Sequence, residues 1–147
     1  MEIEKSNQKQ FYKILCSHSK NKDPKLSILE WDFRYSFLEE NNCICGNAIK
    51  ENCIIENNQT GYILIVGNIC INKFLNKDVS FIFKGLNAIK KLESPNKSFI
   101  NYCKDKGYIS DFEYSFLINM FRKKKFTIKQ KEFKNSILLK LRGRNKW

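Results

Sequence analysis

Four cysteines gather in one part of the sequence: Cys43, Cys45, Cys53 and Cys70, spaced C-x-C-x7-C-x16-C. Cysteine thiolates are preferred ligands of structural zinc, which takes four ligands in a tetrahedron. Because Cys43 and Cys45 share a polar turn with a glycine and an asparagine, they are poor candidates for core packing. The pattern therefore predicts a zinc site. A closed set of four thiolates leaves no position for water or substrate, so the expected metal is structural rather than catalytic.

The fourth ligand of this site is the least determined of the set. Cys53 falls on a predicted strand, and Cys16 or His18 could replace it. An iron–sulfur cluster also uses four thiolates, but the spacing does not match its common sequence patterns. Cys103 lies within a predicted helix and is expected to belong to the core or the surface there. Zn²⁺ is therefore the expected cofactor, with Cys53 as the first choice for its fourth ligand.

A β-hairpin and a helix are expected to bring the cysteines together. Residues 29–37 alternate between apolar and polar side chains, which is typical of a half-buried strand. Residues 48–57 and 62–66 form two β-rich runs joined by a short loop. Cys70 then opens a short helix. This order of turn, hairpin and helix-borne ligand resembles a treble-clef or ribbon-like zinc fold. The predicted fold class is α+β, with a small zinc-stabilised antiparallel sheet followed by a helical C-terminal half.

Helical patterns dominate the rest of the chain. A short helix is predicted over residues 8–16, before a polar loop at 17–25. Ser110 and Thr127 each begin a capping-box pattern at a helix start. The predicted helices of the C-terminal half cover residues 79–92, 97–106, 110–120 and 127–141. The third of these is expected to bury a stripe made of Phe112, Phe116, Leu117 and Met120. The last residues, around Gly143, are expected to fray.

These elements suggest three segments within one compact domain. Residues 1–27 hold the first helix and its loop, residues 28–76 the zinc-binding β-rich module, and residues 77–147 a helical region with a basic tail. A chain of 147 residues is long enough to bury a sizeable core.

Positive charge is concentrated at the C-terminal end. The chain carries a net charge of +12, of which residues 122–147 contribute +10. A one-sided basic helix favours contact with the phosphate backbone of nucleic acid, with low sequence specificity because base-reading side chains form no clear row. A solvated lysine-rich face or an acidic protein partner would show the same charge. The predicted nucleic-acid-binding residues are Arg122, Lys123, Lys124, Lys125, Lys129, Lys131, Lys134, Lys140, Arg142 and Arg144.

Other functional classes find little support in the sequence. There is one histidine, no H-E-x-x-H motif and no Gly-rich phosphate loop, so a non-enzymatic protein without a small-molecule substrate is expected. No apolar run reaches roughly 18 residues and no secretory signal is visible, which favours a cytoplasmic location without a membrane partner. The abundance of Lys, Asn and Ile indicates an A/T-rich genome, such as that of a low-GC bacterium, a phage or a large DNA virus.

The cysteine segment also resembles a known group of proteins. The motif C-x-C-G … V-G-N-x-C-I-x-K-F, here running from Cys43 to Phe74, resembles small, largely uncharacterised zinc-binding proteins of bacteria, phages and large DNA viruses. The similarity extends over residues 28–140 and includes Trp31. It implies a shared zinc-stabilised fold and supports Cys53 as a ligand. It implies no activity, so a viral or phage factor that docks on a host protein is the alternative function.

Overall fold

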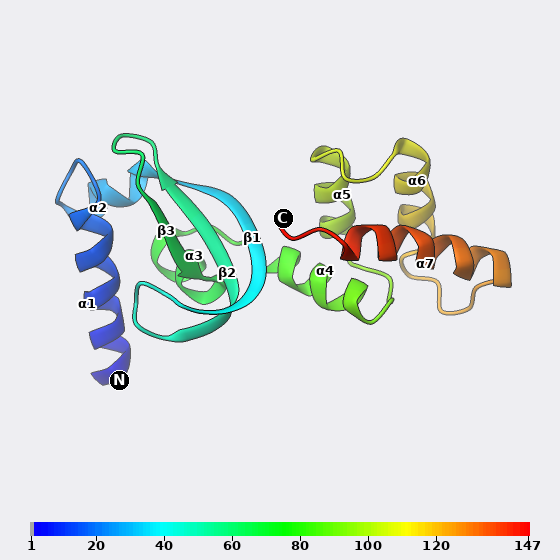
Figure 1. Cartoon of the computed structure of the whole chain (residues 1–147), viewed down its shortest axis with the longest axis horizontal. Helices are drawn as coiled ribbons and strands as arrows, with labels where there is room; N and C mark the ends of the chain where they lie inside the picture. The colour runs from blue at the N-terminus through cyan, green and yellow to red at the C-terminus, as the bar shows by residue number, and fades with distance from the viewer. Residues whose placement is uncertain (1) are drawn as a thin grey trace. The chain divides into compact units, whose positions relative to one another are not determined.

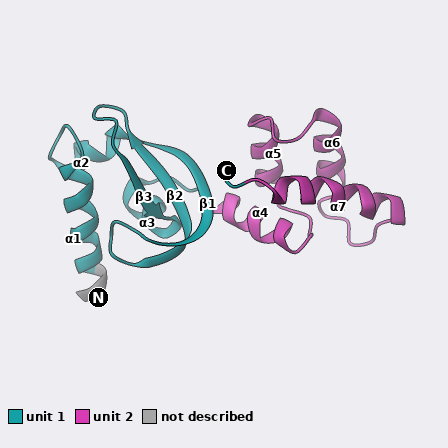
Figure 2. Cartoon of the chain, viewed as in Figure 1, with its two compact units in different colours: residues 1–79, 145–147 teal, residues 80–144 magenta. Residues whose placement is uncertain are grey.

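The computed structural model describes residues 2–147, with side chains from Lys5 onward. The described chain divides into two compact units (Figure 2). Unit 1 contains Met1–Val79 together with Asn145–Trp147, and unit 2 contains Ser80–Arg144. In sequence, the helical unit 2 is thus inserted between two segments of unit 1. The expected segments 1–27, 28–76 and 77–147 within one domain stay a prediction; in the structure, residues 1–79 belong to one unit and the last three residues return to it.

The expected α+β class is confirmed in its main features (Figure 1). Unit 1 contains a three-stranded antiparallel sheet near the group of cysteines, and a helical half follows it in the chain. The strand order is β1-β2-β3. The first helix begins at Glu2, six residues before the predicted start at residue 8. In chain order the elements are α1 (Glu2–Ser17), α2 (Pro24–Ser27), the 3-10 helix η1 (Ile28–Glu30), β1 (Trp31–Asn42), β2 (Ala48–Asn57), β3 (Ile63–Gly67) and α3 (Asn68–Leu75).

A bulge in β1 changes which side chains face the core. Phe33 pairs with Ile55 and Tyr35 pairs with Ile54, so Arg34 is an extra residue on β1. A one-residue shift moves the following side chains to the opposite face of the strand. Consequently Ser36 is fully buried, although strict alternation from 29 to 37 placed it outside. Beyond the bulge, the register aligns Ser36 with Cys53 on β2, and Cys53 with Val66 on β3.

A buried polar network fixes the loop between α1 and α2. The carboxylate of Glu30 accepts hydrogen bonds from the backbone N–H groups of Lys20, at 2.8 Å, and Asn21, at 2.9 Å. The Nδ2 of Asn57 donates a third, at 3.2 Å. Burial raises the pKa of Glu30, but these donors outweigh it and the net pKa is lowered. The network ties the polar loop to the sheet.

The C-terminal residue extends the sheet at the free edge of β1. The backbone N–H of Trp147 donates to the carbonyl oxygen of Ser36 at 2.8 Å, and the N–H of Ser36 donates back to the carbonyl of Trp147. The Trp147 side chain is 3% exposed. The Nζ of Lys146 lies 4.9 Å from the centre of the Tyr35 ring. The expected fraying at the C-terminus is therefore wrong, because the last residue has a strand partner and a buried side chain.

Unit 2 consists of α4 (Ser80–Lys90), α5 (Lys97–Asp105), α6 (Asp111–Met120) and α7 (Ile128–Arg142). Both predicted capping boxes are present, one at Ser110 and one at Thr127. The helices pack closely: a Cβ added at Gly85 would lie 2.1 Å from the ring of Phe99, which is fully buried. The predicted stripe of α6 is wrong at Phe112, which is 73% exposed; Leu117 is the buried residue of that helix.

Candidate metal centre

The loop between β1 and β2 is a tight turn built around two cysteines. The backbone N–H of Cys43 donates to the carbonyl of Asn47 at 2.9 Å, and the N–H of Gly46 donates to the carbonyl of Cys43, also at 2.9 Å. Gly46 has a φ of +99°, a conformation that glycine adopts without a steric penalty. The turn therefore needs its glycine to hold Cys43 and Cys45 in place.

Three of the predicted ligands come together at this turn. The Sγ atoms of Cys43, Cys45 and Cys70 all lie within 4.8 Å of one another. Cys43 and Cys45 come from the turn, and Cys70 from the first turn of α3. Their exposed fractions are 3%, 1% and 9%. Three converging, buried sulfur atoms could hold a metal ion such as zinc, because thiolates are its preferred structural ligands.

Hydrogen bonds already favour a thiolate at Cys43. The thiol of Cys70 is the main donor to it and lowers its pKa; burial acts in the opposite direction. The backbone N–H groups of Cys45, at 3.5 Å, and Gly67, at 3.3 Å, donate to the same sulfur. Together they lower the pKa of Cys43 to about 6. The pKa of Cys70 is raised by the shared hydrogen bond with Cys43 and by burial, while burial raises that of Cys45.

Cys53 does not belong to this group. Its side chain is fully buried on the central strand, with its Sγ 3.8 Å from the Oγ of Ser36. Burial raises the pKa of Cys53 to about 12, although the hydrogen bond with Ser36 lowers it in part. The sulfur distances thus bring three of the four expected ligands together, and Cys53 as the fourth ligand stays a prediction.

The two alternatives to Cys53 are also outside the group. The Nδ1 of His18 is 2.9 Å from the carbonyl oxygen of Ile14, and its ring packs at 4.8 Å from that of Tyr62. Cys16 is half-buried on α1. Among residues 5–147, Cys43, Cys45 and Cys70 are the residues of the His, Cys, Asp and Glu types whose ligand atoms converge, and no fourth residue of these types joins them.

The predicted basic residues do not form one uniform surface. Lys140 is paired with Glu113, with a shortest N–O distance of 2.6 Å, and the guanidinium of Arg144 lies 3.4 Å from the Tyr108 ring centre. The Nζ of Lys123 donates to the side chain of Gln130 at 3.1 Å. All the predicted residues except one are solvent-exposed. The exposed set is Arg122, Lys123, Lys124, Lys125, Lys129, Lys131, Lys140, Arg142 and Arg144.

The exception is Lys134, which the structure removes from any outer basic face. Its side chain is 8% exposed, and its Nζ lies 4.5 Å from the centre of the Phe126 ring. The reason is its position on α7: Lys134, Ile137, Leu138 and Leu141 follow the spacing of one buried helix stripe. Its long side chain packs along this stripe, and a cation–π contact stabilises its charge.

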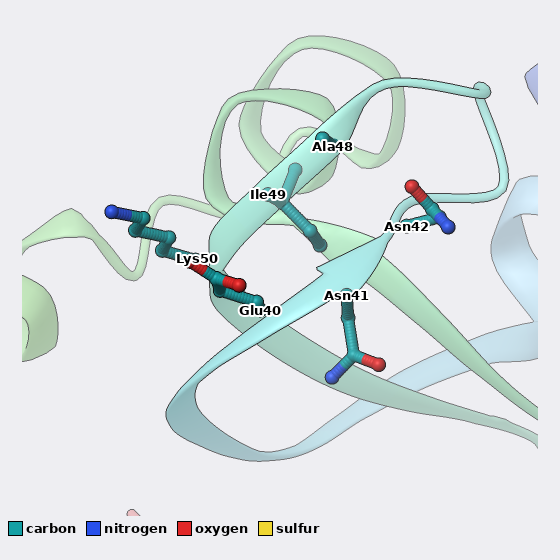
Figure 3. A pocket seen from close by; sticks show the side chains of 6 residues that line it. All are labelled: Glu40, Asn41, Asn42, Ala48, Ile49 and Lys50. Carbon is teal, nitrogen blue, oxygen red and sulfur yellow. The ribbon is translucent and has the colours of Figure 1, made fainter.

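A pocket lies at the base of the cysteine turn (Figure 3). It has a volume of about 460 Å³ and is lined by the end of β1 and the start of β2. Asn41 and Asn42 supply amide groups, and Lys50 reaches away from them in Figure 3. Its lining contains none of the cysteines, so the pocket is separate from the metal centre in its chemistry.

Sequence reasoning missed two features of the site. One is the hydrogen bond from the N–H of Gly67 to Cys43, for which the sequence offers only a glycine at a strand end. The partnership of Cys53 with Ser36 depends on the bulge in β1, which the alternating pattern conceals. In both cases the tertiary pairing of the strands determines the result.

Comparisons with known proteins find no matching family model, no matching curated protein and no matching solved structure. The similarity of the cysteine segment to small proteins of bacteria, phages and large DNA viruses thus stays a prediction. Among the residues that the structure describes, no helix has the length and apolarity needed to cross a membrane.

Proposed function

We propose that this chain is a non-enzymatic zinc-binding protein that contacts nucleic acid through the basic part of unit 2. The observation that carries the zinc half is the convergence of Cys43, Cys45 and Cys70 within 4.8 Å. Zinc bound there would fasten the turn after β1 to the start of α3. Because a small three-stranded sheet has limited stability by itself, such a link contributes folding free energy.

The nucleic-acid half is supported by a narrower set of cations than the sequence indicated. We define the basic segment as Lys124, Lys125, Lys129, Lys131 and Arg142, which are exposed and have no hydrogen-bond or ion-pair partner among the described residues. Their side chains can approach phosphates without first breaking a protein contact. If all five bind phosphates, the slope of log K against log salt is about −4 to −5.

Filter binding with single-stranded DNA, double-stranded DNA and RNA across a salt series tests this proposal. We expect a variant with the five residues changed to Gln to bind at least about tenfold more weakly at 50 mM salt, because phosphate contacts dominate affinity. A matched control neutralises five exposed lysines of unit 1: Lys5, Lys9, Lys13, Lys25 and Lys50. Equal loss in both variants, or no binding by the wild type, contradicts a role for the basic segment.

A protein partner is the second candidate. Two apolar side chains of unit 2 are unusually exposed, Phe112 at 73% and Ile128 at 80%. Ile128 is followed by the exposed Lys129, and such a pair suits an acidic protein with an apolar patch, such as a host protein docked by a viral or phage factor. A nuclease-resistant, stoichiometric partner that is lost in the double variant Phe112→Ser with Ile128→Ser would favour this function over nucleic-acid contact.

A further inference from the structure

The metal centre offers three thiolates where zinc takes four ligands. Cys43, Cys45 and Cys70 converge, and no other His, Cys, Asp or Glu of residues 5–147 joins them within 4.8 Å. Structural zinc sites are almost always closed by four protein ligands, whereas three protein ligands leave a position for water or another molecule. A fourth protein ligand would have to come from a side chain near the three cysteines.

Cys53 lies outside the group of three, although it is close enough to Cys43 that, besides burial, the charge on Cys43 raises the pKa of Cys53. It lies on β2, the central strand, between β1 and β3. Its Sγ is 3.8 Å from the Oγ of Ser36, which belongs to β1. The group of three is connected to β3, because Cys70 lies in the first turn of the helix that follows this strand and the N–H of Gly67, at the end of β3, donates to Cys43. Cys53 becomes the fourth ligand only if its Sγ moves closer to the other three sulfur atoms.

The next turn of α3 does not supply a ligand either. Residues three and four positions after Cys70 lie on the same face of the helix. These are Lys73, whose exposed amine lies 5.5 Å from the ring centre of Phe74, and Phe74 itself, which is 8% exposed. A cationic amine and a phenyl ring are not zinc ligands at neutral pH.

The three cysteines differ in how deeply they are buried. Cys43 and Cys45 are 3% and 1% exposed, whereas Cys70 is 9% exposed and its neighbour Ile69 is 78% exposed. Of the three cysteines, Cys70 is thus the least deeply buried residue.

We propose that zinc bound by Cys43, Cys45 and Cys70 keeps its fourth coordination position for a ligand from solution, and that a low-molecular-weight thiol occupies it in preference to water. This inference rests on the proposed zinc site. In the exchange, the incoming thiol releases its proton to solvent, its sulfur forms a bond to zinc, and the bound water leaves. The zinc remains Zn²⁺ throughout, so the step requires no oxidant or reductant. A soft thiolate suits a site that already contains three thiolates.

X-ray absorption at the zinc edge of the wild-type protein tests the inference without any variant. In buffer free of thiol and chloride we expect three sulfur neighbours at about 2.3 Å and one oxygen or nitrogen neighbour at about 2.0 Å. After 2-mercaptoethanol is added, we expect four sulfur neighbours. Four sulfur neighbours before any thiol is added would overturn the inference and leave the zinc site itself intact.

Cobalt substitution in Cys53→Ala provides an independent test. The thiolate-to-cobalt charge-transfer intensity of Cys53→Ala should equal that of the wild type, whereas Cys70→Ser should lose about a third of it or lose the metal. A loss of about a quarter in Cys53→Ala would show that Cys53 is the fourth ligand. If neither zinc nor cobalt binds to the folded wild type, the proposed zinc site and this inference both fail.

Discussion

The backbone N–H of Gly67, the last residue of β3, donates a hydrogen bond of 3.3 Å to the Sγ of Cys43. These two residues are 24 positions apart in the chain, so the bond joins the end of the sheet to the turn after β1. It also helps to keep Cys43 as a thiolate before any metal arrives. The candidate metal centre is thus supported by the backbone of the sheet as well as by its own turn.

Replacing the glycine of the cysteine turn tests this support. Gly46→Ala places a side chain at a φ of +99°, which costs about 1–2 kcal/mol in the left-handed region. We expect a similar loss of stability in Gly61→Ala, where φ is +77° in the β2–β3 loop. Only Gly46→Ala should also lower the affinity for zinc, which is measured by competition with a chromophoric chelator. Equal zinc affinity in the two variants would contradict the role given to the turn.

The packing of α4 on α5 makes Gly85 sensitive to substitution. A methyl group there would meet the ring of Phe99 at 2.1 Å, and Phe99 is fully buried. Gly85→Ala should therefore lower the free energy of unfolding by about 1–3 kcal/mol, the usual cost of overpacking. Gly143→Ala is the matched control, since its nearest contact is an ordinary 3.5 Å. Urea denaturation followed by circular dichroism measures both; an unchanged midpoint for Gly85→Ala would refute this packing.

The stability of unit 1 should depend on the ionisation of Glu30. Its folded pKa is lowered, because three hydrogen-bond donors outweigh the effect of burial. The stabilisation is therefore fully present above the unfolded pKa of about 4.3 and is lost as pH falls through the lower, folded value. Glu30→Gln should flatten the acid side of the stability–pH curve, measured by urea unfolding from pH 7 to pH 3. The exposed Glu39→Gln serves as control; identical curves for both variants would contradict the buried network.

The C-terminal residue should matter to the sheet module. Trp147 is 3% exposed and pairs with Ser36 through two backbone hydrogen bonds. Trp147→Ala should lower the free energy of unfolding by about 3 kcal/mol, as for other buried aromatic side chains. Tyr62→Ala, which removes a ring that is 55% exposed, should cost less. Hydrogen exchange of the Ser36 amide reports the effect locally, and unchanged protection in Trp147→Ala would exclude this docking.

Part of the site can be predicted from the sequence because it depends on local chemistry. Cys43 and Cys45 share a turn whose glycine is required by its backbone angle, and Cys70 follows a strand end. The contact between Cys53 and Ser36 cannot be predicted from such local patterns. It depends on a single extra residue, Arg34, which shifts the register of β1 and turns Ser36 toward Cys53. A bulge leaves the alternating pattern of residue types unchanged while it alters the faces they occupy.

The helical unit shows the same limits. The two capping boxes, at Ser110 and Thr127, are local hydrogen-bond patterns and are found where the sequence predicts them. The burial of Lys134 follows from its helical spacing with Ile137 and Leu141. Because lysine is normally an exposed residue, this spacing alone does not predict that Lys134 is buried. The pairing of Trp147 with Ser36 joins residues more than a hundred positions apart, and no local pattern indicates it.

The metal content of the purified chain, measured by native mass spectrometry, tests the zinc site without assuming any function. We predict one zinc per wild-type chain, retained in Cys103→Ser and lost in Cys70→Ser. Both positions are buried cysteines, but Cys103 lies in unit 2, outside the group of three. Removal of zinc with a chelator should also lower the stability of the wild type, because metal binding contributes folding free energy. A wild-type protein that is folded and free of metal after growth in zinc-supplied medium would show that Cys43, Cys45 and Cys70 do not form a zinc site.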